Sequence, residues 1–66
     1  MKQKVANYTV KIAADKNGNF FAHVPAMPVC DTGGKSIEET VLNARRSIIY
    51  HLEALEELGL PRPKEE

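Results

Sequence analysis

The residues of this chain that could carry chemistry are few: one cysteine, two histidines and a handful of carboxylates. Cys30 and His23 have the residue types of a nucleophile and its general base. That chemistry also needs an orienting third group and an oxyanion hole, which the surrounding sequence does not fix. Because a lone cysteine most often serves as a small buried hydrophobe, we expect Cys30 to be structural and the chain not to be an enzyme.

The carboxylates could serve a two-metal nuclease only if several of them converged on one point. Asp15 lies in a turn-like segment, Glu38 and Glu39 stand at the start of a predicted helix, and only Asp31 is left over. Turn and helix-cap roles therefore explain most of them better than catalysis does. Two histidines and one cysteine are also too few for a closed zinc site with four ligands, so we expect no metal and no cofactor.

The segment 32–36, Thr-Gly-Gly-Lys-Ser, looks like the end of a phosphate-binding P-loop. That motif would need a glycine at position 29, where this chain has Val29. A P-loop fold also needs a parallel sheet and a second acidic strand for Mg²⁺, for which 66 residues leave no room. Two glycines before a capped helix explain the segment more simply, with a weak anion site at the helix N-terminus as the open alternative.

The elements that position these residues begin with a predicted β-hairpin. Residues 5–14 alternate apolar and polar side chains with the period of two that marks a half-buried strand. The Asn-Gly pair at 17–18 tolerates positive φ and predicts a turn, and a second strand follows over about 20–24. Pairing Ile12 with Ala22 places both apolar sets on one face and leaves Phe21 on the other.

A short third strand is predicted over about 29–32, broken by Gly33-Gly34. Ser36 and Glu39 form a capping box that starts a helix running to about Leu58, with an apolar stripe at helical spacing. Gly59 is a natural end for this helix. The predicted fold class is α+β, with a three-stranded antiparallel sheet (β-β-β-α) and one long helix packed on one face. The chain is expected to be one domain over 1–66, with a core of about 5–60 and an extended or disordered tail, 61–66.

The charges balance overall but are unevenly placed. Nine basic and nine acidic residues cancel, while residues 1–35 carry a net charge of +3 and residues 36–66 a net charge of −3. A balanced chain does not have the basic character of a nucleic-acid binder, so no direct nucleic-acid partner is expected. No apolar run suits a signal peptide or a membrane span, and a single thiol suits a reducing compartment, so we expect a cytoplasmic protein.

The pattern of residues then resembles a known family. Tyr8-x-Val10-x-Ile12 and Asp15-x-x-Gly18-x-Phe20-Phe21-Ala22-x-Val24-Pro25 are similar to the opening hairpin of HicB-like antitoxin domains. The similarity continues through Pro28-x-Cys30-x-Thr32-x-Gly34-x-Ser36-x-Glu38-Glu39, Asn43-Ala44 and Ser47-Ile48, and it covers about residues 7–60. Ala26 and Val29 depart from the acidic residue and the glycine that are usual in the family, which changes the loop before the third strand.

The resemblance implies a degenerate RNase H-like sheet with one helix, and binding to a HicA-type toxin, a small basic RNA-cleaving protein whose active site the antitoxin covers. Full-length family members commonly add a C-terminal DNA-binding domain; we expect no such domain, and no DNA-binding function, in this chain. An orphan structural or oligomerisation domain without a toxin is the alternative.

The residues expected to bind a partner are exposed aromatic, basic and acidic side chains, namely Phe21, His23, Arg46, Tyr50, Glu53, Glu56 and Glu57. A homodimer or larger assembly is expected because a helix of roughly 33 Å would overhang a small sheet. That overhang would leave apolar residues exposed at Leu52, Leu55, Leu58 and Leu60, in addition to Phe21 on the sheet.

Overall fold

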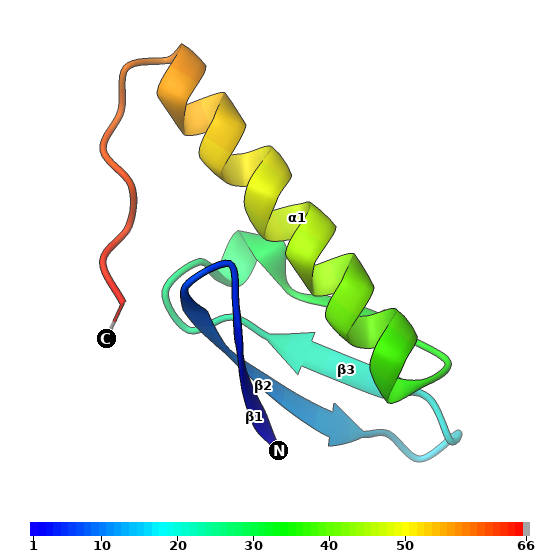
Figure 1. Ribbon diagram of the computed structural model, residues 1–66. Coiled ribbons are helices and arrows are strands. Elements are labelled where there is room, and N and C mark those ends of the chain that lie inside the picture. The colour runs from blue at the N-terminus through cyan, green and yellow to red at the C-terminus, as the bar shows by residue number, and fades with distance from the viewer. Residues whose placement is uncertain (66) are drawn as a thin grey trace.

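A four-stranded antiparallel sheet with one long helix across one of its faces forms the computed structural model, which describes residues 1–65 (Figure 1). The strands lie side by side in chain order: β1 (Lys2–Val5), β2 (Tyr8–Ala14), β3 (Phe20–His23) and β4 (Thr32–Gly34). A short 3-10 helix, η1 (Pro28–Cys30), precedes β4, and α1 (Ile37–Glu57) follows it. The α+β class and the helix-on-sheet arrangement are confirmed, but the sheet has four strands rather than three.

The extra strand arises because the predicted first strand is a hairpin. A two-residue turn at Ala6-Asn7 separates β1 from β2 and pairs Val5 with Tyr8. Both turn residues have positive φ, +50° at Ala6 and +72° at Asn7, as a tight type I′ turn requires. Asparagine adopts this conformation readily, whereas alanine rarely does. Only one of the two turn residues is therefore of a type that predicts a hairpin turn.

The second hairpin has the predicted register, with Ile12 opposite Ala22 and Ala14 opposite Phe20. The Asp15 carboxylate accepts hydrogen bonds from the backbone N–H groups of Asn17 and Asn19, at 2.8 and 3.0 Å. Gly18 takes a φ of +81° at the turn. The turn role assigned to Asp15 is therefore confirmed.

The predicted third strand is displaced along the chain. Residues 28–30 form η1, and the strand begins at Thr32 and includes both glycines that were expected to break it. A Cβ at Gly33 would lie 2.8 Å from the carbonyl oxygen of Phe20, so only glycine lets β4 approach β3 this closely. The glycine pair is thus part of the sheet.

The predicted ends of α1 are confirmed, with one change. The Ser36 hydroxyl accepts a hydrogen bond from the N–H of Glu39 at 3.0 Å, as predicted. The Glu39 carboxylate accepts a hydrogen bond from the N–H of Lys35 at 3.3 Å, whereas the predicted capping box had the N–H of Ser36 as the donor. At the other end, the Leu60 N–H donates to the Leu55 carbonyl at 2.9 Å, and Gly59 has a φ of +70°. This is a Schellman end.

The core lies between α1 and one face of the sheet, and it consists of Val5, Tyr8, Val10, Ile12, Ala22, Val24, Met27, Cys30, Ala44, Ile48 and Leu52. The buried Thr40 hydroxyl donates to the Ser36 carbonyl at 2.7 Å. Beyond the sheet, Leu58 and Leu60 are exposed as expected, but Leu52 is buried and Leu55 is partly buried. The expectation for these two was wrong because it lacked the β1–β2 hairpin, whose turn lies beside Leu52.

Candidate functional site

The structure places the residues predicted to bind a partner in two separate groups. Phe21 and His23 flank the buried Ala22 of β3, so they lie on the sheet face that α1 does not cover, with Phe21 about half exposed. Arg46, Tyr50, Glu53 and Glu57 are spaced four, three and four residues apart, which sets them in one stripe on the outer side of α1. Glu56 lies off this stripe, toward the β1–β2 turn at Ala6 and Asn7, so the seven residues do not form one site.

The helix stripe is the more accessible of the two groups. Tyr50 is 76% exposed, and Arg46 one turn before it is exposed as well. Glu53, Glu56 and Glu57 follow in the last turns of α1, and all three are exposed. This end of the helix thus offers an aromatic ring beside the carboxylates of Glu53 and Glu57, with Glu56 on the neighbouring side of the helix, a combination that suits a basic protein surface.

On the opposite face, His23 has a partner that the sequence interpretation missed. Its Nδ1 lies 2.9 Å from one carboxylate oxygen of Asp31, and the other oxygen accepts the Val24 N–H at 2.8 Å. The loop through η1 brings Asp31 back to the end of β3, so the pair depends on a connection of seven residues. Asp31 fixes the imidazole and leaves its Nε2 edge available to a partner.

Cys30 does not join this pair. The thiol is buried against α1 and contacts the Ser47 carbonyl oxygen at 3.6 Å. Burial raises the pKa of Cys30 above its ordinary value; the contact with Ser47 lowers this pKa by a smaller amount, and the charge of Asp31 raises it by the least. A protonated thiol in this setting is a poor nucleophile, which agrees with a structural role.

The groups behind the other chemical alternatives have the following positions in residues 1–65. Within residues 1–65, no three His, Cys, Asp or Glu side chains come together as a possible metal site. In the P-loop-like segment, Gly33 and Gly34 pair with β3 and the Ser36 hydroxyl caps α1, so these groups already have structural roles. In the part of the chain that the structure describes, no helix is both long and apolar enough to cross a membrane.

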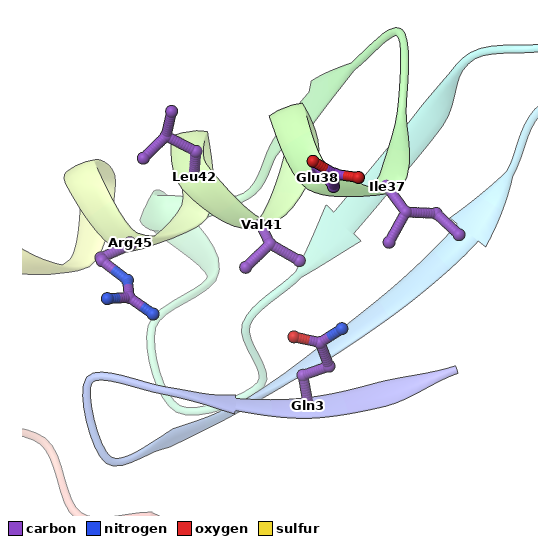
Figure 2. A pocket seen from close by; sticks show the side chains of 6 residues that line it. All are labelled: Gln3, Ile37, Glu38, Val41, Leu42 and Arg45. Atoms are coloured by element: carbon purple, nitrogen blue, oxygen red, sulfur yellow. The ribbon is translucent and has the colours of Figure 1, made fainter.

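A groove between α1 and β1 is a feature that sequence reasoning did not find. It has a volume of about 290 Å³ and is lined by Gln3, Ile37, Glu38, Val41, Leu42 and Arg45. Figure 2 shows Gln3 of β1 pointing toward the helix and Val41 pointing back toward β1. Since β1 is an edge strand, the groove adjoins unpaired backbone groups.

A second missed feature is the C-terminal segment, residues 60–65, which returns along the β1–β2 hairpin (Figure 1). The Tyr8 hydroxyl donates to the Pro63 carbonyl at 2.8 Å. The Glu65 carboxylate pairs with Lys4 and accepts from the Thr9 hydroxyl at 2.6 Å. The tail, 61–66, was expected to be extended or disordered. Residues 61–65 are extended without regular secondary structure, and Glu66 lies outside the described residues.

Two curated proteins are similar to this chain in sequence. No protein-family model matches it. It is 34% identical to the UPF0150 protein Ta0767 of Thermoplasma acidophilum over 58 residues, which cover 88% of this chain and 84% of that protein. It is 30% identical to the UPF0150 protein ssr1765 of Synechocystis over 64 residues, covering 97% and 81% of the two chains.

A solved structure extends the comparison to the fold. The chain superposes on the crystal structure of the N-terminal domain of the Burkholderia pseudomallei antitoxin HicB with a TM-score of 0.76 and 29% identity. The match covers 79% of this chain and 61% of that one, which is less than two thirds of the crystallised domain. On these two lines of evidence, the chain belongs to the UPF0150 family and has the HicB-like fold that its sequence pattern resembled.

Proposed function

We propose that this chain is an antitoxin-like protein-binding domain, with no chemistry of its own, that neutralises a HicA-type toxin in the cytoplasm by covering its active site. The observation that carries the proposal is the match to the antitoxin HicB domain, at a TM-score of 0.76 and 29% identity. The structural roles of Cys30, buried against α1, and of Ser36, which caps α1, also favour a domain that binds a partner over one that catalyses a reaction.

The outer side of α1 is the surface that we assign to the toxin. Glu53 and Glu57 are exposed there beside Tyr50, Glu56 is exposed on the neighbouring side of the helix, and the same half of the chain carries the net charge of −3. A toxin that binds RNA presents a basic surface, so carboxylates here would steer the encounter and speed association. Tyr50 and Arg46 are of the residue types that concentrate binding energy at the centre of interfaces.

The test requires a HicA-type toxin, sought as a small basic protein encoded next to the gene of this chain, and measures its association with the chain by stopped flow. Changing Glu53, Glu56 and Glu57 together to glutamine should slow association, most strongly at low salt, because exposed charges are screened as salt rises. The control is Glu38→Gln, which removes an exposed carboxylate at the other end of α1. An association rate that ignores both the charges and the salt concentration would contradict the assignment of this surface.

The alternative function is a self-associating domain without a toxin, and one observation favours it. Leu42 and Ile49 are 46% and 44% exposed on the flank of α1 that lies toward β1. An apolar flank beside a free strand edge is suited to a second copy of the chain. If no neighbouring gene encodes a toxin that binds the chain, and the chain still forms a defined oligomer, this alternative is preferred.

A further inference from the structure

The face of the sheet that α1 leaves uncovered carries a row of positive charge. Lys2 and Lys4 of β1 and Lys11 of β2 are all exposed there, and Lys2 stands directly opposite Lys11 in the register. Like charges on directly opposed residues of neighbouring strands destabilise a sheet. Within residues 1–65, neither Lys2 nor Lys11 is paired with a carboxylate. An anionic group placed between these lysines would relieve the repulsion.

The structure already holds one carboxylate at the border of this row. Glu65 pairs with Lys4 and accepts from the Thr9 hydroxyl, and Thr9 is the cross-strand partner of Lys4. A hollow of about 230 Å³ continues from there, lined by Lys2, Thr9, Lys11, Pro25, Ala26 and Glu65. The hydrogen bonds from Lys4 and then Thr9 hold the pKa of the Glu65 carboxyl below its usual value, so the surface favours the ionised form.

The backbone around Glu65 shows which kind of anion suits the surface. Residues 60–65 approach as an extended chain, and the Pro63 carbonyl accepts a hydrogen bond from the Tyr8 hydroxyl at 2.8 Å. The contacts thus combine a main-chain carbonyl with a side-chain carboxylate two residues later. A peptide offers both groups at this spacing, whereas a free phosphate offers only the charge.

We propose that the outer sheet face around Lys2, Lys4 and Lys11 is a binding site for an extended acidic peptide of a partner protein, and that residues 60–65 occupy its border in cis. The chain's own segment then competes with the partner peptide, because its tether holds the Glu65 carboxylate at a high effective concentration. This site lies on the sheet face away from the stripe of α1 assigned to the toxin, and it stands independently of that assignment.

The probe is the acetylated and amidated peptide Pro-Glu-Pro-Glu-Glu, titrated into the ¹⁵N-labelled full chain and followed by the amide shifts of Lys4, Thr9 and Lys11. Glu65→Gln should bind this peptide roughly tenfold more tightly than the unchanged chain, since it removes one competing charge-assisted contact. Adding Lys2→Gln and Lys11→Gln to Glu65→Gln should abolish the gain. The control is Lys16→Gln with Lys35→Gln, which removes the same charge from two loops outside the hollow.

Each outcome decides the matter. Tighter binding by Glu65→Gln that depends on Lys2 and Lys11, but not on Lys16 and Lys35, supports the site and its occupation in cis. Equal loss in the control pair would show only unspecific attraction by charge and overturn the proposal. A response to inorganic phosphate without one to the peptide would overturn it in favour of a phosphate site. If Glu65→Gln binds the peptide no more tightly than the unchanged chain, residues 60–65 do not compete with the peptide and the proposed occupation in cis is wrong. Well-dispersed amide spectra of every variant establish that each one is folded.

Discussion

At the scale of single residues, Ser36 gives the sharpest link between sequence and stability. Its hydroxyl accepts the N–H of Glu39 at 3.0 Å and satisfies a donor that the first turn of α1 would otherwise leave unpaired. Ser36→Ala should therefore lower the free energy of unfolding by about 1 kcal/mol, measured by urea denaturation. Ser47→Ala, in the middle of α1, is the matched control and should change little; equal loss in both variants would contradict a specific cap.

Cys30 leads to a prediction about reactivity. Burial raises the pKa of this thiol, so at neutral pH it is protonated and shielded beneath α1. Ellman's reagent should label native Cys30 far more slowly than the urea-unfolded chain, and the native rate should rise only when the pH passes above the ordinary range of a thiol. Labelling at the unfolded rate at neutral pH would mean that the packing around Cys30 is wrong.

Single-residue roles were predictable where they depend on near neighbours. The Asp15 turn, the Ser36 cap and the Gly59 helix end each involve groups within about five residues, and the sequence indicated all three. The His23–Asp31 pair was missed because its residues meet only after the loop through η1 folds back. The contact of Glu65 with Lys4 spans nearly the whole chain, so no local pattern could reveal it.

At the scale of elements, the strands show where pattern reasoning reaches its limit. The alternation was correct about which side chains face the core over residues 8–12, though not for Val5, and it gave the register of β2 with β3. It missed the turn at Ala6-Asn7, which pairs Val5 with Tyr8 on one face, whereas a continuous strand would set these two residues on opposite faces. Sequence reasoning also placed β4 too early, because glycine usually weakens a strand. Here Gly33 is needed in the strand because the Phe20 carbonyl leaves no room for a Cβ, and Phe20 is too distant in sequence for a local pattern to reveal this.

Gly34 tests this interpretation of β4. A Cβ at this position would lie 2.8 Å from the Thr40 hydroxyl oxygen and 2.9 Å from the Thr40 backbone nitrogen, so the strand or the helix start would have to move. Gly34→Ala should cost about 1–3 kcal/mol of unfolding free energy, as overpacking typically does. Gly59→Ala is the comparison, because its Cβ would meet nothing within 4 Å and only its positive φ is unfavourable, by about 1 kcal/mol. A smaller loss for Gly34→Ala than for Gly59→Ala would contradict the close packing.

At the scale of the whole molecule, exposed apolar surface predicts self-association. Leu42 and Ile49 flank the free edge of β1, and Phe21 is exposed on the other face of the sheet. We expect sedimentation equilibrium at micromolar concentration to give a mass above the 7.3 kDa of one chain, and Leu42→Glu with Ile49→Glu to reduce it. A mass of one chain that persists as concentration rises would exclude the assembly, and Phe21→Glu tests whether the sheet face contributes instead.

The central claim, that this chain neutralises a toxin by covering its active site, is tested most directly by RNA cleavage. A HicA-type toxin found next to this gene would be assayed on a labelled RNA while the full chain is titrated in. The account predicts that cleavage falls to background at a fixed stoichiometric ratio, and that Tyr50→Ala raises the amount of chain required, because Tyr50 lies at the centre of the assigned surface. Cleavage that continues unchanged in a large excess of the chain, with a toxin shown to be active, would contradict the account.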